Sequence, residues 1–223
     1  MNQNDDKPRA AMILAAGRGE RMRPLTDSTP KPLLKVRGRP LIERHVEALA
    51  SAGITRLVIN LAWLGSQIRD YLGDGSRYGV RIVYSEEAKA LETAGGIIRA
   101  LPHLSPGPFA VVNGDIFTDY RFDSLKLPPG LDAHLVLVAN PPQHPAGDFG
   151  IVNGLAVDEG AERFTFSGIA VYREALFAGQ PDGPARLKPL LVRSMSVSRC
   201  SAEVFQGLWE DVGTPERLTA LNA

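Results

Sequence analysis

Two glycines and three arginines lie close together in the stretch ILAAGRGERMRP near the start of the chain. Gly17 and Gly19 carry no side chain, so a ligand can approach the backbone closely at both positions. Arg18, Arg21 and Arg23 can meet phosphate oxygens in the forked geometry of the guanidinium group. The stretch follows an apolar run, and a junction between a strand and a helix presents backbone N–H groups to anions. It therefore predicts a phosphate-binding loop, with a merely solvated loop as the alternative.

Neither of two familiar phosphate-binding motifs fits this loop. The NTPase motif G-x-x-x-x-G-K-[ST] needs a second glycine five residues after Gly17, followed by Lys-Ser or Lys-Thr. The dinucleotide fingerprint G-x-G-x-x-G needs a glycine at the same place. Met22 stands there in this sequence. An ATPase of that class and a nicotinamide-dependent enzyme are therefore poorly supported.

Three further charged residues could act on phosphates bound at this loop. Lys31 lies between two prolines in TPKPLLKV, which favour a stiff, extended segment. Asp115 follows the apolar stretch FAVV in an Asn-Gly-Asp sequence, at the end of a predicted strand, where open α/β sheets bind ligands. Asp211, in LWEDVGTPERL, is a candidate second carboxylate for Mg²⁺, which favours a few carboxylates together with substrate phosphates. An ordinary turn at Asp115 and a plain helix entry at Asp211 are the alternatives.

Apolar periodicity predicts the elements that must position these residues, because it changes repeatedly between strand and helix character. The pattern indicates an α/β fold with a central mixed, mainly parallel sheet and helices on both faces. The Asn153-Gly154 pair predicts a tight hairpin within a small β-rich insertion. Strands are predicted at residues 11–16, 56–61, 80–85, 109–114, 133–140 and 163–172, with a closing strand near 203–213. Helices are predicted at residues 39–53, 64–75, 93–102, 186–195 and 215–223.

Composition restricts the classes of protein that the chain can belong to. The 223 residues are 44% hydrophobic, have a net charge of +0 and contain one cysteine, Cys200. The first 45 residues hold ten Lys/Arg and five Asp/Glu, a net charge of +5, so the remainder carries −5. This balance favours a small anionic ligand over nucleic acid or a membrane surface. No apolar run reaches the roughly 18 residues of a membrane span, and a cytoplasmic protein is expected.

Taken together, these motifs resemble the sugar-1-phosphate nucleotidylyltransferase family. LAAGRGERMRPLT is similar to its signature loop, TPKPL to its lysine segment, LETAGG to its nucleobase loop, and NGD and WEDVGT to its two metal-binding segments. The resemblance implies a Rossmann-like nucleotidyltransferase fold in a single domain over residues 1–223, with residues 1–9 flexible and no C-terminal β-helix. It also implies that a sugar 1-phosphate attacks a nucleoside triphosphate and releases pyrophosphate.

The resemblance assigns roles to individual residues. It implies Arg21 on the departing pyrophosphate, Lys31 between the two reacting phosphates, and Mg²⁺ on Asp115 and Asp211. The residues implied for nucleotide binding are Leu14, Ala15, Ala16, Gly17, Arg18, Gly19, Glu87, Thr93, Gly95, Gly96 and Asn113. Those implied for the β-rich sugar pocket are Asn140, Asp148, Gly150, Glu162, Ser167 and Gly168.

The sequence gives weaker evidence for the identity of the base and the sugar. A carboxylate at Glu87 could accept both N–H groups of guanine, whereas backbone N–H groups near Gly95 and Gly96 would suit the two carbonyl groups of uracil. The wider resemblance favours UTP, with N-acetylmuramate 1-phosphate as the sugar. The alternatives are a mannose- or heptose-1-phosphate guanylyltransferase and a nucleotide-sugar sensor without catalysis. Small molecules are the expected partners, without nucleic acid or membrane, and the expected state is a monomer or weak homodimer.

Overall fold

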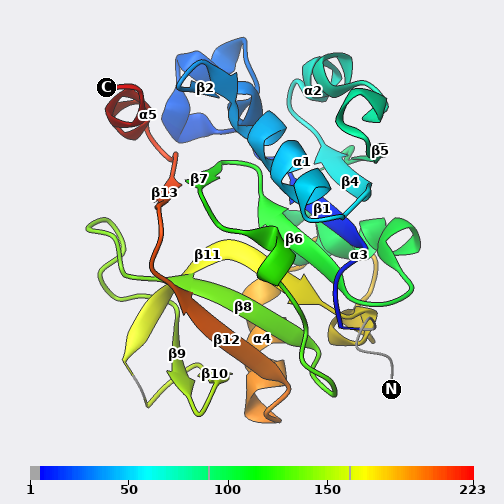
Figure 1. Ribbon diagram of the computed structural model, residues 1–223, viewed down its shortest axis with the longest axis vertical. Coiled ribbons are helices and arrows are strands. Elements are labelled where there is room, and N and C mark those ends of the chain that lie inside the picture. Colours follow the sequence, from blue (N-terminus) through cyan, green and yellow to red (C-terminus); the bar gives the residue numbers. More distant parts are fainter. Residues whose placement is uncertain (1–5, 90, 161) are drawn as a thin grey trace.

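The computed structural model describes residues 6–89, 91–160 and 162–223, and within these ranges nine strands form one mixed sheet (Figure 1). The strands are β1 (Ala10–Leu14), β4 (Arg56–Leu61), β5 (Arg81–Glu86), β6 (Phe109–Asn113), β8 (Ala133–Val138), β9 (Phe149–Val152), β10 (Leu155–Val157), β11 (Arg163–Tyr172) and β12 (Cys200–Phe205). Their order across the sheet is β5-β4-β1-β6-β11-β8-β12-β10-β9. The predicted mixed sheet is confirmed.

The first half of the sheet is parallel and its strands end together. β5, β4, β1 and β6 run in one direction, and the register places Leu14 opposite both Asn60 and Asn113, and Asn60 opposite Ser85. β1, β4 and β6 are mostly apolar because both of their faces are covered, whereas β5 at the sheet edge is half polar. The loops that follow them therefore leave the sheet along one edge, where parallel α/β sheets bind their ligands.

The second half of the sheet is built mostly from antiparallel pairs. β11 runs antiparallel to β6 and β8, and β9 and β10 form the hairpin predicted at Asn153-Gly154. β8 and β12 are the parallel pair of this half. β11 is irregular between Phe166 and Ile169, where a β-bulge shifts its register against β8. Such bulges redirect side chains near functional sites.

Helices cover both faces of the sheet, as the sequence predicts (Figure 1). α1 (Leu41–Ser51) and α2 (Gly65–Leu72) bury Ile42, Val46, Leu49, Ile68 and Leu72 against one face. α3 (Glu92–Leu104) and α4 (Leu187–Ser196) bury their apolar stripes against the other face. The apolar residues of these helices repeat every three or four positions, and this spacing forms one continuous stripe. The short 3-10 helices span Glu20–Met22, Leu25–Asp27, Lys31–Leu33, Ser76–Tyr78, Phe122–Ser124 and Glu174–Phe177.

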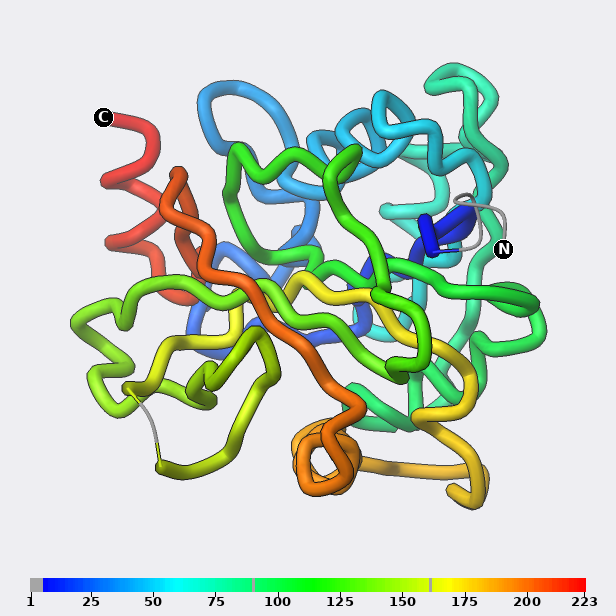
Figure 2. Tube along the Cα trace, turned by 60° about the horizontal axis from the view of Figure 1, so that its bottom comes forward, coloured from blue at the N-terminus to red at the C-terminus, as the bar shows by residue number. Residues whose placement is uncertain are grey.

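The prediction of one closing strand at residues 203–213 is wrong, because the segment forms two strands in different sheets. β12 belongs to the main sheet, whereas β13 (Trp209–Asp211) pairs with β7 (Ile116–Thr118). Gly207 lies between them, and a Cβ atom there would come within 2.3 Å of the Phe205 ring. Figure 2 shows this segment crossing the molecule towards α5 (Pro215–Asn222).

The terminal helix lies beside the small hairpin of β2 (Lys35–Val36) and β3 (Arg39–Pro40) (Figure 1). The Asn222 side chain accepts a hydrogen bond from Arg37 N and donates one to Lys35 O. At the other end of the chain, residues 1–5 lie outside the described residues, and the expected flexibility of residues 1–9 stays a prediction. The helices of the described residues do not combine the length and apolar content that a bilayer-crossing helix needs.

Candidate active site

The glycine loop that follows β1 forms one wall of a first cavity of about 280 Å³. A Cβ atom at Gly17 would meet no other atom within 4 Å, so the backbone there faces open space. Gly19 is different: it has φ 67° and packs closely on Lys31 and Thr26, whose hydroxyl donates to Gly19 O at 2.8 Å. The described residues that line this cavity are Leu14, Ala15, Ala16, Gly17, Lys31, Pro32, Asn60, Glu87, Leu91, Glu92, Thr93, Asn113 and Asp115.

A buried pair of polar side chains fixes the shape of this cavity. Asn60 Oδ1 accepts a hydrogen bond from Ala15 N at 2.8 Å, and Asn60 Nδ2 donates to Glu87 Oε1 at 2.7 Å. The second carboxylate oxygen of Glu87 accepts from Leu91 N at 3.3 Å. The loop after β1, the end of β4 and the segment between β5 and α3 are therefore connected through these two side chains. Sequence reasoning missed Asn60, although an asparagine in the otherwise apolar end of RLVINL was a signal of a buried polar role.

Four residues expected in nucleotide binding lie outside the lining of the first cavity. Arg18 stacks over the Trp63 ring at 4.8 Å, and Gly19 packs behind the loop on Lys31. Gly95 and Gly96 are buried in the first turns of α3. Gly95 N donates to Ala185 O at 3.2 Å, so the expectation that it is free to meet a base needs correction. Gly96 instead leaves room for the Glu87 carboxylate, which a Cβ atom would approach to 2.7 Å.

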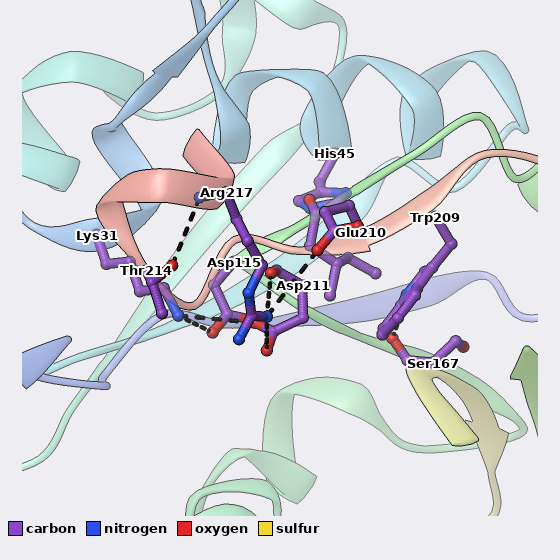
Figure 3. Close-up of polar contacts among 10 residues, drawn as sticks. Lys31, His45, Asp115, Ser167, Trp209, Glu210, Asp211, Thr214 and Arg217 are labelled. Atoms are coloured by element: carbon purple, nitrogen blue, oxygen red, sulfur yellow. Dashed lines mark hydrogen bonds and ion pairs between the residues drawn. The ribbon is translucent and has the colours of Figure 1, made fainter. Parts of the chain in front are cut away.

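Lys31 and Asp115, which line the first cavity, belong to a charged centre with Asp211 and Arg217 (Figure 3). Lys31 Nζ is 2.5 Å from Asp115 Oδ2 and 4.0 Å from Asp211 Oδ1, and the lysine side chain is only 9% exposed. Arg217 Nη1 is 3.0 Å from Asp211 Oδ2 and also donates to Asp211 O at 2.7 Å. Two carboxylates thus converge on one buried ammonium group, with a guanidinium group behind the second carboxylate.

The pairing of β7 with β13 brings the two aspartates together. Asp211 lies opposite Ile116, the residue next to Asp115, and Val212 N donates to Asp115 O at 3.0 Å. Among the described residues, no cluster of three or more His, Cys, Asp or Glu side chains is arranged to hold a metal ion. A pair of carboxylates still fits Mg²⁺, because this ion usually takes one or two carboxylates and fills its remaining positions with water and substrate phosphates.

His45 lies directly behind this centre, on α1. Its Nε2 atom is 3.0 Å from Ile116 O, and the residue is 3% exposed (Figure 3). Burial disfavours the imidazolium form and lowers the pKa of His45 to about 4. The histidine is therefore neutral at physiological pH and supports β7 through its contact with the main chain.

A second cavity of about 290 Å³ meets the first at Asn113 and Asp115. Arg21 belongs to this second cavity, not to the wall of the first. Trp209 closes one side and donates from Nε1 to Ser167 O at 2.9 Å (Figure 3). The described lining residues are Arg21, Asn113, Asp115, Ile116, Pro141, Gln143, His144, Thr165, Phe166, Ser167, Trp209 and Asp211.

Of the residues expected to bind the sugar, Ser167 lines this cavity, but its hydroxyl is used internally. Ser167 Oγ donates to Val136 O at 2.6 Å and accepts from Ile169 N. Gly168 has φ 82° and packs on Asn113, whose Nδ2 atom would lie 2.5 Å from an added Cβ atom. These two residues form the bulge of β11, and their visible role is to shape the cavity wall.

The remaining expected sugar residues are not part of the described lining. Asn140 donates to Pro145 O and Arg163 O and accepts from Thr165 Oγ1, so its amide holds the loop between β8 and β9. Gly150 is buried in β9, and Glu162 is exposed. Asp148 lies behind the wall, where it contacts His144. Asn140 and Asp148 thus use polar atoms within the protein, and a contact of these four residues with the sugar stays a prediction.

Sequence reasoning missed several residues that do line the second cavity, among them Trp209 and His144. Trp209 stands two positions before Asp211, and side chains two apart on a strand share a face, which was a usable signal. His144 lies in the turn after β8, and a single histidine in the polar stretch NPPQHP gave no comparable indication.

The sequence model of the family described as "Nucleotidyl transferase" matches residues 10–165. An N-acetylmuramate alpha-1-phosphate uridylyltransferase from Neisseria meningitidis serogroup B is 53% identical over 223 residues, with 96% of each chain covered. A protein of the same name from Caulobacter vibrioides is 34% identical, with 97% of this chain and 96% of that protein covered.

Solved structures extend this likeness to the fold. A crystal structure of a provisionally assigned glucose-1-phosphate thymidylyltransferase from Bacillus anthracis, in complex with a sucrose, has a TM-score of 0.84. The two chains are 22% identical, and the match covers 96% of this chain and 94% of the chain from Bacillus anthracis. This likeness supports the Rossmann-like nucleotidyltransferase fold. The family match spans β1, the glycine loop, Lys31 and Asp115. The chain therefore belongs to the nucleotidyl transferase family.

Proposed function

We propose that the chain transfers a uridylyl group from UTP to N-acetylmuramate 1-phosphate, forming a nucleotide sugar and releasing pyrophosphate. The observation that carries this proposal is the meeting of the two cavities at Asp115, beside Lys31. One cavity suits the nucleotide and the other the sugar phosphate, so the reacting groups would meet at the charged centre. The name of the relative that is 53% identical supports uridylyl transfer and this sugar.

The reaction does not require a covalent bond between the protein and a substrate. An oxygen of the sugar phosphate attacks the α-phosphorus in line and forms the new P–O bond. The bond from the α-phosphorus to the bridging oxygen breaks, and its electrons leave with pyrophosphate. The attacking phosphate is already ionised near neutral pH, so no general base is required. The main barrier is repulsion between anions, and positioned cations and N–H groups lower it.

Residues of the first cavity would bind UTP. The backbone of the glycine loop, which is open at Gly17, would accept the triphosphate, because exposed N–H groups at such a junction attract anions. Asn60 holds Ala15 N, and this contact fixes where the loop begins. Thr93 and Asn113 border the same cavity and offer polar contacts to the nucleoside.

Lys31 and Arg21 would supply the positive charge that the reaction needs. Lys31 lies between Asp115 and Asp211 and would bridge the α-phosphate and the incoming sugar phosphate. Arg21 borders the second cavity together with both aspartates, where it would counter the charge of the phosphate groups during transfer. Its position favours a larger effect on turnover than on the binding of UTP alone.

Asp115 and Asp211 would hold Mg²⁺ when the substrates are present. The ion would supply electrostatic stabilisation of charge on the reacting phosphates. Lys31 and Arg217 neutralise the two carboxylates in the structure, so these side chains keep the pair together before substrates bind. Arg217 also fixes the orientation of Asp211, since it contacts both the carboxylate and the main chain of that residue.

The position of Glu87 favours uracil over guanine. A carboxylate that reads guanine must turn its acceptor sites towards the base, and each oxygen of Glu87 already accepts a hydrogen bond from the protein. The argument from Glu87 alone for GTP is weakened by these contacts. Uracil can then be read by the loop that Glu87 supports at Leu91.

A panel of substrates tests the proposal. Pyrophosphate release is measured with UTP, GTP, dTTP and ATP against N-acetylmuramate, N-acetylglucosamine, glucose and mannose 1-phosphates, with Mg²⁺ and with EDTA. We expect the highest kcat/KM with UTP and N-acetylmuramate 1-phosphate, and no turnover in EDTA. Strong activity with GTP and mannose 1-phosphate, and none with the favoured pair, would overturn the choice of substrates. Nucleotide binding without any pyrophosphate release would indicate a sensor instead.

The two cavities meet at Asn113 and Asp115, so one chain supplies residues for both proposed substrate sites. We propose a monomer or weak homodimer in one catalytic domain, acting in the cytoplasm, where nucleoside triphosphates are available. Light scattering during gel filtration at micromolar concentration measures the oligomeric state directly. A stable trimer or larger assembly would contradict this part of the proposal.

A further inference from the structure

His144 is a second potential cation in the wall of the sugar cavity, besides Arg21. It lies on the loop between β8 and β9, where His144 N donates to Pro141 O and Gly147 N donates to His144 O. Asn140 connects this loop to β11 through its bonds to Pro145 O and Arg163 O. The loop is therefore held on both sides, and the main chain of His144 has a fixed position beside the cavity.

Asp148 lies next to the imidazole ring of His144. Nε2 of His144 is 3.2 Å from Asp148 Oδ1, while Asp148 Oδ2 accepts a hydrogen bond from Phe166 N at 2.9 Å. Asp148 is therefore fixed to β11 through Phe166, and the buried Nε2 atom of His144 lies near its Oδ1 atom without a hydrogen bond among the described residues. A protonated imidazole has an N–H donor on each ring nitrogen, so Nε2 can stay beside Asp148 while Nδ1 donates to a ligand.

We propose that His144 binds the lactyl carboxylate of the sugar and thereby selects a muramate phosphate over a neutral hexosamine phosphate. The proposal rests on the function proposed above, which makes N-acetylmuramate 1-phosphate the acceptor. That molecule carries two anionic groups. Its phosphate belongs with Lys31 and the aspartate pair, so its carboxylate needs a separate cation in the same cavity.

The charged side chains around the cavity form two groups, one for the phosphate of the sugar and one for its carboxylate. Asp115, Asp211 and Lys31 form the centre at which the phosphates meet, and Arg21 is the cation that borders it. His144 is the remaining lining side chain of the described cavity that can carry positive charge, and Asp148 faces it from outside the lining. The lactyl carboxylate would be repelled by the aspartates and would accept a hydrogen bond from the His144 ring, and this contact would orient the sugar.

The test compares two sugar phosphates that differ in the lactyl group. kcat/KM is measured with UTP and either N-acetylmuramate 1-phosphate or N-acetylglucosamine 1-phosphate, for the wild type, His144→Gln and His144→Arg. We expect His144→Gln to lower kcat/KM for the muramate by about 10- to 100-fold, the usual range for a hydrogen bond to a charged group. Its kcat/KM for the glucosamine should stay within about twofold, and His144→Arg should retain much of the preference for the muramate.

His103→Gln is the matched control, because His103 is exposed on α3, away from the described cavity wall. An equal loss with both sugars in His144→Gln would indicate a structural role for the loop and overturn the proposal. Unchanged discrimination would overturn it as well.

The two proposals fail in different ways. Uridylyl transfer that does not distinguish the two sugars in the wild type would overturn the role of His144 and leave uridylyl transfer standing. Absence of uridylyl transfer would overturn the proposed function instead. Calorimetric titration of wild type and His144→Gln with N-acetylmuramate 1-phosphate alone then decides the role of His144, with equal Kd values counting against it.

Discussion

Nζ of Lys31 lies 2.5 Å from Oδ2 of Asp115, although 84 positions separate the two residues in the chain. The lysine follows the glycine loop, whereas the aspartate follows the fourth strand of the parallel half of the sheet. Their contact joins the loop that would hold the triphosphate to the edge that would hold the metal ion. A buried ion pair of this kind contributes little net stability unless its geometry is good, because both charges lose water. Its position at the junction of two cavities therefore points to function.

Replacement of Lys31 should remove most of the turnover. We expect Lys31→Ala to lower kcat by a factor of about 10² or more, as the loss of a positioned electrostatic stabiliser usually does. Pyrophosphate release under saturating substrates measures this effect. Lys35→Ala is the matched control, because Lys35 is exposed on the neighbouring hairpin. A Lys31→Ala protein with kcat near that of the control would remove Lys31 from the mechanism.

Asp211→Asn should abolish Mg²⁺-dependent turnover while the protein stays folded. The amide preserves the size of the side chain but is neutral, so it is a weaker ligand for a hard cation. Activity titrated against Mg²⁺ and a circular dichroism melt measure the two properties separately. Asp70→Asn changes an exposed carboxylate on α2 and should behave as the wild type. Equal activity of both variants at every Mg²⁺ concentration would exclude a metal role for Asp211.

Arg21→Ala should affect turnover more than the binding of UTP. Arg21 borders the second cavity and is not in the described lining of the first. We expect kcat to fall by about 10²-fold, comparable to the loss of one transition-state donor. The Kd for UTP, measured by titration without sugar phosphate, should change by less than about threefold, a difference of under ~1 kcal/mol. A larger change in this Kd than in kcat would place Arg21 on the bound triphosphate.

Two neighbouring glycines of α3 should respond differently to an added methyl group. A Cβ atom at Gly96 would approach Glu87 Oε1 to 2.7 Å, whereas at Gly95 it would approach Gly183 O to 2.3 Å. A side chain can shift more readily than a main-chain carbonyl, so Gly96→Ala should raise KM for UTP with a small change in Tm. Gly95→Ala should lower Tm instead. An unchanged KM for UTP in a folded Gly96→Ala protein would contradict the idea that Glu87 shapes the nucleotide cavity.

His45 should make the stability of the protein depend on pH. Burial lowers the pKa of His45 to about 4 in the folded state, below the value near 6.5 of an exposed histidine. As the pH falls through 6.5, the unfolded chain binds a proton that the folded chain does not. Stability is therefore complete above pH 6.5 and is lost progressively towards pH 4, by up to roughly 3 kcal/mol.

Urea unfolding between pH 4.5 and 7.5 measures this loss. His45→Gln removes the titrating group and should flatten the dependence of the free energy of unfolding on pH. His103→Gln leaves His45 in place and should keep the slope of the wild type. A slope in His45→Gln that matches the wild type would assign the dependence to other groups.

Much of the fold was readable from local patterns. The stretches around Met12, Val58 and Val111 are apolar throughout, and a strand covered on both faces requires this composition. Asn153-Gly154 specified the hairpin because two positive φ angles are required there. The break between β12 and β13 was not readable, because it depends on the contact between Gly207 and Phe205 and on the pairing of β13 with a distant strand.

The sequence by itself determined which residues could do chemistry: the glycine loop, Lys31, Asp115 and Asp211 all follow from residue types at defined places in the chain. The tertiary structure alone decided that the two aspartates meet, because the pairing of β7 with β13 joins segments that are remote in sequence. It also decided that Asn140 and Ser167 use their polar atoms internally and that His144 and Trp209 face the cavity. Side-chain direction depends on strand register and on a bulge, and both are set by packing between distant segments.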